Sequence, residues 1–133
     1  MAEPRVILLV DDDGDFVEMN RHVLEAAGYA VVAASNRPEA LARLAESKID
    51  LVITDLMMGE LNSGFSLAAA IKGDAKLCRL PVILATSAAR QAGYDFSPRS
   101  AADLAHMNAD AFFEKPLRPA ELLAKVAELL GTP

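Results

Sequence analysis

The sequence predicts an α/β fold in which a doubly wound, five-stranded parallel sheet has the strand order 2-1-3-4-5. Short, almost wholly apolar segments alternate along the chain with segments of helical period. The apolar segments lack the polar alternation of a strand with one face in water, so helices are expected to cover both faces of the sheet. Right-handed crossovers join strands of this kind, and the length of 133 residues fits the five-stranded order.

The expected strands are residues 6–10, 30–34, 49–54, 82–85 and 111–113. Each segment is too short to stand alone as a helix, and most are rich in β-branched residues. Ligands of such a sheet lie beyond the carboxyl ends of its strands, near the point where the strand order reverses. The residues that directly follow strands one, three, four and five are therefore expected to meet.

Four sets of apolar residues recur at helical spacing and predict the buried stripes of four helices. They are Phe16, Met19, Val23 and Ala27; Leu41, Leu44 and Ala45; Phe65, Leu67, Ala68 and Ile71; and Leu122, Leu123, Val126, Leu129 and Leu130. Gly28 is expected to end the first helix, and Ser35 or Asn36 to cap the second, which has Pro38 near its first turn.

Residues 88–108 do not follow this alternation. The segment is polar and rich in alanine, and Gly93, Tyr94, Phe96 and Pro98 precede a weak helical pattern at 101–107. We expect a long loop followed by a short helix.

Composition excludes several classes of protein. The chain has 13 Lys plus Arg against 19 Asp plus Glu, a net charge of -6, which disfavours direct binding to nucleic acid. No apolar run approaches the roughly 20 residues of a membrane span, so membrane insertion is not expected. The single cysteine, Cys78, cannot form an intramolecular disulfide, and the N-terminus has no signal-like segment, which favours the cytoplasm. We expect one domain over residues 1–133, with a core at about 5–130 and no effector domain in this chain.

Polar side chains follow four of the expected strands. Asp11 and Asp12 follow the first, Asp55 the third, Thr86 the fourth and Lys115 the fifth. Three carboxylates at one sheet edge repel one another unless a cation lies between them, and oxygen ligands at this density suit a hard ion such as Mg²⁺. One divalent ion and one lysine would neutralise the three carboxylates, so a phosphoryl group could enter. Asp55, the central acid, is the candidate nucleophile.

Four motifs then resemble the signatures of the receiver domain of two-component response regulators. They are VILLVDDD at 6–13, DLMM at 55–58, PVILATS at 81–87 and FFEKP at 112–116. Any one motif is weakly specific, but four in this order at strand ends are strong support. The resemblance covers about residues 5–130 and implies the flavodoxin-like receiver fold.

The resemblance implies a role for each acid. Asp55 matches the phosphoacceptor, which takes a phosphoryl group from a phosphohistidine on a sensor histidine kinase or a histidine phosphotransfer protein. Asp12 would bind Mg²⁺ directly and Asp11 largely through water. Asp55 and the backbone carbonyl of Met57 would complete the ligands that the protein supplies.

The resemblance also implies a switch. Thr86 matches the hydroxyl that turns toward the phosphoryl group, and Lys115 the residue that pairs with that group. Phe112 matches the aromatic residue that moves inward once Thr86 leaves space, and Lys115–Pro116 matches a cis peptide bond. The domain would be a signalling module that changes its contacts with a downstream protein, not a metabolic enzyme. Dimerisation through the last helices is common in the family, and the sequence leaves it open.

Two of the departures of this chain from the family pattern bear on the site and on the output face. Met58-Gly59 stands where the family usually has Met-Pro, and the segment between Thr86 and Lys115 is several residues longer than usual, so the output face is expected to differ. Met57 and Ala88, at the two positions that influence hydrolysis in receivers, cannot orient a water molecule by side-chain hydrogen bonds. We expect slow autodephosphorylation.

The residues leave two other functions possible. Asp11 and Asp13 after an apolar strand mimic the Asp-x-Asp motif of aspartate-nucleophile phosphohydrolases, although the chain lacks room for a cap domain and shows no later acidic pair. The second alternative is a receiver-like interaction module that is never phosphorylated.

Overall fold

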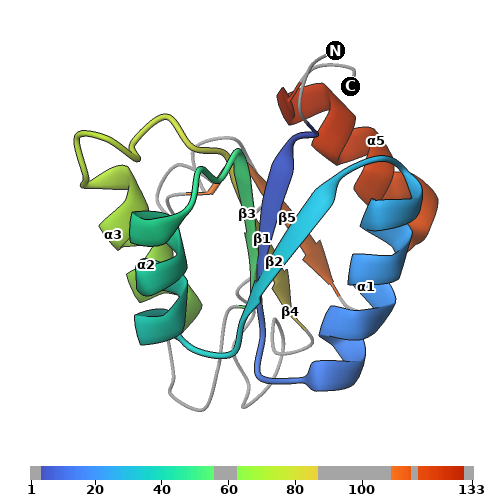
Figure 1. The fold of residues 1–133 in the computed structure, drawn as a ribbon, viewed down its shortest axis with the longest axis horizontal. Coiled ribbons are helices and arrows are strands. Elements are labelled where there is room, and N and C mark those ends of the chain that lie inside the picture. The colour runs from blue at the N-terminus through green and yellow to red at the C-terminus, as the bar shows by residue number, and fades with distance from the viewer. Residues whose placement is uncertain (1–3, 56–62, 87–108, 115–116, 131–133) are drawn as a thin grey trace.

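The computed structural model of the chain describes residues 4–55, 63–86, 109–114 and 117–130, without the side chains of 63–66, 86 and 114. Five parallel strands form one sheet in the order β2-β1-β3-β4-β5, as predicted (Figure 1). The strands are β1 Val6–Val10, β2 Ala30–Ala34, β3 Leu51–Thr54, β4 Val82–Thr86 and β5 Ala111–Glu114.

Three strand boundaries differ from the prediction by one or two residues. β4 and β5 each extend one residue further, to Thr86 and Glu114. β3 begins at Leu51, directly after Asp50, which forms two hydrogen bonds to the first residue of β1. Its backbone N–H donates to the carbonyl of Val6 (2.8 Å), and its side-chain Oδ2 accepts from the N–H of Val6 (2.8 Å). Asp50 thus ties the start of β1 to the segment before β3.

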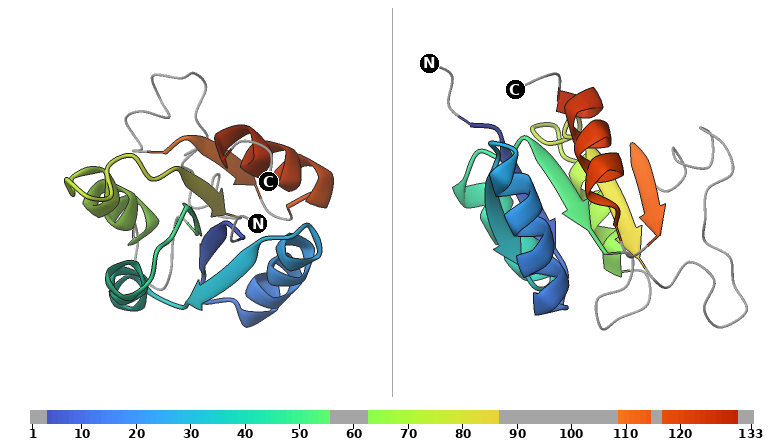
Figure 2. Two further views of the ribbon diagram at one scale, coloured as in Figure 1. Left: turned by 45° about the horizontal axis from the view of Figure 1, so that its top comes forward. Right: turned by 90° about the vertical axis from the view of Figure 1, so that its right-hand side faces the viewer.

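Helices cover both faces of the sheet. α1 Gly14–Ala26 and α5 Pro119–Leu130 lie on one face, and α2 Arg37–Glu46 and α3 Ser63–Lys72 lie on the other (Figures 1 and 2). Each pair encloses its own apolar cluster with the sheet. Ile7, Leu9, Leu51 and Ile53 belong to the cluster under α1 and α5, whereas Leu8, Val10 and Val52 belong to the cluster under α2 and α3. The alternation of side chains along a strand produces this division.

The prediction for the buried stripe of the first helix was wrong at Met19, whose exposed fraction is 52%, and at Ala27, which is exposed and follows the last residue of α1. The buried residues of α1 are Phe16, Val17, Asn20 and Leu24. Asn20 interrupts the apolar pattern, but its side-chain Nδ2 donates to the carbonyl of Phe16 (2.8 Å), so the polar group is satisfied inside the core. The predicted end of the helix is confirmed, because Gly28 has a φ of 100° that favours glycine.

The predicted stripe of the second helix was wrong at Ala45, which is exposed, whereas Leu44 is buried and Leu41 is half-buried. Asn36 caps α2, with its Oδ1 accepting from the N–H of Glu39 (2.8 Å), which settles the choice between Ser35 and Asn36. Leu67, Ala68 and Ile71 of α3 are buried, as are Leu122 and Val126 of α5. The helix predicted at 101–107 lies outside the described residues. In the part of the chain that is described, no helix has both the length and the apolar character needed to span a membrane.

Candidate metal and phosphoryl site

The sheet brings Asp11 and Asp55 together. Val10 and Thr54, the last residues of β1 and β3, are partners in the parallel register. The residue after each of these strands is an aspartate, and the backbone N–H of both aspartates forms a hydrogen bond to a neighbouring strand. The N–H of Asp55 donates to the carbonyl of Val10 (2.9 Å), and the N–H of Asp11 donates to the carbonyl of Ala34 (3.0 Å). The backbone of both acids is therefore fixed by the sheet itself.

A short turn fixes the side chain of Asp11 as well. Its Oδ1 accepts a hydrogen bond from the backbone N–H of Asp13 (2.9 Å). Asp13 is in turn the N-cap of α1, and its Oδ1 accepts from the N–H groups of Asp15 (3.0 Å) and Phe16 (3.3 Å). The chain thus passes from β1 into α1 through a hydrogen-bonded turn with Asp12 at its centre.

The acidic residues between positions 11 and 18 therefore have different roles. Asp13 caps α1, Asp15 lies in the first turn, where a negative charge interacts well with the helix dipole, and Glu18 pairs with Arg21 (3.3 Å). Of these acids, Asp13 and not Asp15 is the N-cap of α1. An Asp-x-Asp motif that used Asp13 as a catalytic group would have to release this cap.

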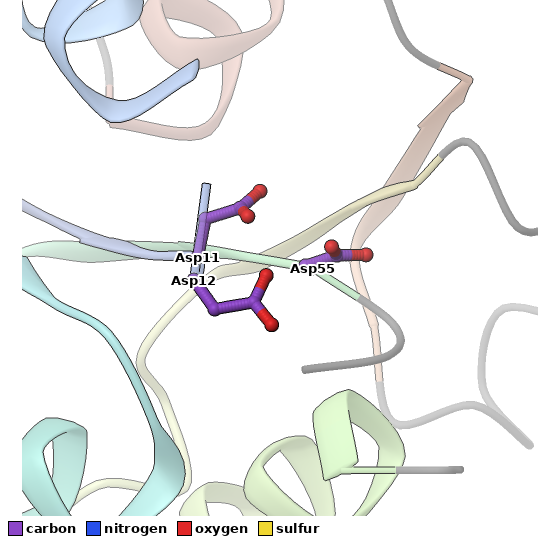
Figure 3. A group of neighbouring side chains, drawn as sticks. All are labelled: Asp11, Asp12 and Asp55. Atoms are coloured by element: carbon purple, nitrogen blue, oxygen red, sulfur yellow. The ribbon is translucent and has the colours of Figure 1, made fainter. Parts of the chain in front are cut away.

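Asp11, Asp12 and Asp55 form the group that can hold a cation. One carboxylate oxygen from each lies within 4.8 Å of the others. Figure 3 shows the three side chains beyond the ends of β1 and β3, with their carboxylates pointing to the same side. Asp11 (2% exposed) and Asp55 (7%) are buried, whereas Asp12 is exposed. The predicted meeting of these three acids is confirmed.

The donor set fits Mg²⁺. All three ligand atoms are carboxylate oxygens, the donors that Mg²⁺ prefers, and they lie within 4.8 Å of one another. Mg²⁺ also keeps several water ligands, which agrees with an exposed Asp12 at the mouth of the group. The arrangement is the acidic triad typical of a magnesium site.

The structure describes the other predicted site residues only in part. Thr86 ends β4, and its side chain is not described. Phe112 is half-buried in β5 and is the register partner of Leu84, two residues before Thr86 along β4. Met57, Lys115 and Pro116 lie outside the described residues.

One polar residue beside the site was not singled out in the sequence. Thr54 is fully buried at the end of β3, and its hydroxyl donates to the backbone carbonyl of Asp55 (3.1 Å). The available signal was a hydroxyl in an otherwise apolar strand, directly before the candidate nucleophile.

The sequence of this chain is similar to those of known response regulators. Residues 7–127 match the family described as the response regulator receiver domain. The transcriptional regulatory protein GltR of Pseudomonas aeruginosa is 33% identical over 129 residues, which cover 97% of this chain and 50% of GltR. The phosphate regulon transcriptional regulatory protein PhoB of the same organism is 31% identical and matches 95% of this chain and 52% of its own length. This chain thus spans about half the length of these regulators.

Solved structures agree with the sequence match. A putative response regulator from Chloroflexus aurantiacus has a TM-score of 0.80 at 28% identity, with 96% of this chain and 98% of that one covered. The chemotaxis response regulator CheY4 of Vibrio cholerae gives the same TM-score at 27% identity, with 96% and 99% covered. With the fold, the acidic triad and a family match over most of its length, the chain belongs to the response regulator receiver domains of two-component signalling.

Proposed function

We propose that this domain accepts a phosphoryl group on Asp55 from a phosphohistidine of a sensor histidine kinase or a histidine phosphotransfer protein, and thereby switches its contacts with a downstream protein. The observation that carries the proposal is the group formed by Asp11, Asp12 and Asp55 at the carboxyl edge of the sheet. Receiver domains are signalling modules whose partners are histidine kinases, and they typically act in the cytoplasm.

Asp55 is the best candidate for the nucleophile because β3 lies at the centre of the sheet, between β1 and β4. A carboxylate oxygen of Asp55 would attack the phosphorus atom. A new O–P bond then forms, the N–P bond of the phosphohistidine breaks, and the departing imidazole nitrogen takes up a proton. Bound Mg²⁺ would neutralise charge on the oxygens of the transferred group. Asp11 and Asp12 would hold that ion with Asp55 and with the backbone carbonyl of Met57.

The switch would use residues of β4 and β5. In this proposal Thr86 turns toward the phosphorylated Asp55, Lys115 pairs with the phosphoryl oxygens, and Phe112 moves into the space that Thr86 leaves. The register of the two strands supports this, since Phe112 lies two residues before Glu114, the partner of Thr86. The cis form of the Lys115–Pro116 bond remains a prediction from the family resemblance.

The phosphorylated state should be long-lived, because the side chains of Met57 and Ala88 cannot orient an attacking water molecule. Replacement of Met57 by Asn supplies a polar group at the position two residues after Asp55. We expect Met57→Asn to lose its phosphoryl group several-fold faster than the wild type, about the effect of one hydrogen bond. Dephosphorylation followed by intact-protein mass spectrometry after removal of the donor tests this. An unchanged or slower rate in the variant would contradict it.

Incubation with Mg²⁺ and acetyl phosphate tests the main proposal. Mass spectrometry of the intact protein should find one added phosphoryl group in the wild type and none in Asp55→Ala. Asp15→Asn is the matched control, because it removes a carboxylate from the same acidic run at an exposed position of α1. It should be labelled like the wild type, and chelation of Mg²⁺ should stop the labelling.

Each other result points to a different function. Labelling that survives Asp55→Ala would refute the assignment of the phosphoacceptor. Hydrolysis of a small phosphate ester that depends on Asp11 would favour the phosphohydrolase. Absence of labelling with donors that phosphorylate other receivers would favour the interaction module that is never phosphorylated.

A further inference from the structure

Thr54 is a polar residue in an apolar place. Its exposed fraction is 0%, and its register partners on both sides are Val10 and Leu84. Val52, the preceding residue on the same face of β3, belongs to the cluster under α2 and α3. Valine has nearly the shape of threonine and would fill this position without burying a hydroxyl. Packing alone therefore does not explain why a threonine ends this strand.

The hydroxyl of Thr54 has a defined partner. It donates to the backbone carbonyl of Asp55 at 3.1 Å, and the bond is buried. That carbonyl belongs to the peptide group between Asp55 and Leu56. On the other side of the residue, the N–H of Asp55 is held by the carbonyl of Val10 (2.9 Å). The two bonds together fix the backbone before and after the Cα atom from which the Asp55 carboxylate projects.

The orientation of this peptide group matters for the site. A rotation about the Cα–C bond of Asp55 would swing its carbonyl away from Thr54 and redirect the chain toward Met57. A carboxylate that binds a metal ion is placed precisely only if the backbone that carries it is held in one orientation. Small displacements of such a ligand lower metal affinity and reaction rate. A buried hydrogen bond is well suited to this because bulk water does not compete for it.

We propose that Thr54 is a positioning residue of the phosphoacceptor site: its hydroxyl holds the Asp55–Leu56 peptide group so that Asp55 is placed for Mg²⁺ and for the incoming phosphoryl group. Thr54 does not touch the reacting atoms, and it acts through the backbone of Asp55. The inference rests on the function proposed above for Asp55. It adds a residue on the side of the sheet that faces α2 and α3.

Two substitutions separate the hydroxyl from the shape of the side chain. Thr54→Val keeps the branched shape and removes the donor, whereas Thr54→Ser keeps the donor and removes a methyl group. Ile53→Val is the matched control, because it trims a buried side chain of the same strand on the opposite face. The measurements are Mg²⁺ affinity by calorimetry, the rate of labelling by acetyl phosphate, and stability in urea.

Thr54→Val should weaken Mg²⁺ binding and slow labelling, each by about threefold to tenfold, the range that one hydrogen bond supports. Its stability should change little, because the lost hydrogen bond to the Asp55 carbonyl is offset by removal of a buried hydroxyl. Thr54→Ser and Ile53→Val should stay within about twofold of the wild type in both site measurements although they lose some stability. A purely structural role of Thr54 would give the opposite order, with the serine variant more affected than the valine variant.

Wild-type affinity and rate in Thr54→Val would overturn the inference, and so would a serine variant that behaves like the valine variant. If the wild type itself is not labelled on Asp55, the proposed phosphotransfer fails, and the Mg²⁺ titration still decides the role of Thr54. Weaker binding in the valine variant but not in the serine variant would then support the positioning role. Equal binding in all variants would refute it.

Discussion

The two edges of the sheet use aspartate in opposite ways. At the amino edge, Asp50 accepts from the N–H of Val6 (2.8 Å), the first residue of β1. Asp110 accepts from the N–H of Val82 (2.8 Å), the first residue of β4, and from Nζ of Lys72 (3.0 Å). Each of these carboxylates thus has a protein donor that also ties two segments together.

At the carboxyl edge the aspartates follow the strands and lie close to one another. The backbone N–H groups of Asp11 and Asp55 donate to carbonyls of neighbouring strands, and the carboxylates of Asp11, Asp12 and Asp55 approach one another within 4.8 Å. Three negative charges at this spacing favour a divalent cation. The comparison teaches that the grouping of aspartates distinguishes the two edges: at the carboxyl edge three carboxylates lie together, whereas at the amino edge Asp50 and Asp110 each join two separate segments.

The largest expected effect follows from Asp12→Asn at the carboxyl edge. Loss of one negative ligand should reduce labelling of Asp55 by acetyl phosphate about a hundredfold or more, because metal binding supplies several kcal/mol to such reactions. The free energy of unfolding in urea should stay equal or rise, since one repulsive charge leaves the group. Full labelling of this variant would show that the two edges do not differ in the way described.

The matching substitution at the amino edge is Asp110→Ala. It removes the acceptor for the N–H of Val82 and the ion-pair partner of Lys72. The side chain of Asp110 is 37% exposed and that of Lys72 is 23% exposed. We expect a loss of about 1–3 kcal/mol in the free energy of unfolding. Asp110→Asn, which keeps a neutral acceptor, should lose less. Unchanged stability of the alanine variant in a urea titration would contradict the structural role of this acid.

Mg²⁺ itself should distinguish the edges. An ion at ten times its dissociation constant should raise the free energy of unfolding of the wild type by about 1.4 kcal/mol. Asp12→Asn should lose this increase, and Asp110→Asn should keep it. Thermal unfolding with and without Mg²⁺ measures both, with Ca²⁺-free buffer and a chelator as the reference. An equal increase in the two variants would place the ion elsewhere.

The smallest expected effect concerns Glu39, an exposed carboxylate whose hydrogen-bond donors lie a few residues away in the sequence. Hydrogen bonds from the hydroxyl and N–H of Ser35 hold the pKa of Glu39 below its usual value of 4.5. A lowered pKa means that Glu39 stabilises the fold above its unfolded pKa, and that this contribution is lost as the pH falls through the lower folded value. Glu39→Gln should therefore flatten the pH dependence of stability slightly in the acid range. A steeper dependence in the variant, measured by urea titrations across that range, would contradict this.

Most of the fold and the centre of the site could be predicted from the sequence because both depend on patterns along one chain. Apolar runs predicted the strands, and the chain length favoured their order. The acids that follow two of these runs, Asp11 and Asp55, lie together because Val10 and Thr54 are register partners. Met19 was misplaced because a helical stripe does not reveal that Asn20 can enter the core with its amide satisfied by Phe16. The roles of Asp50, Asp110 and Thr54 were not predictable, since each depends on a hydrogen bond whose partner the sequence pattern does not identify.

The most direct test of the account is to locate the phosphoryl group in the unmodified wild-type chain. Borohydride reduces an aspartyl phosphate to homoserine, so treatment after labelling with acetyl phosphate and Mg²⁺ marks the acceptor without any substitution. Peptide mass spectrometry should find homoserine at position 55 and at none of the positions 11, 12 and 13. Conversion at one of those three positions, or none at all in a protein that binds Mg²⁺, would contradict the assignment of Asp55 as the phosphoacceptor.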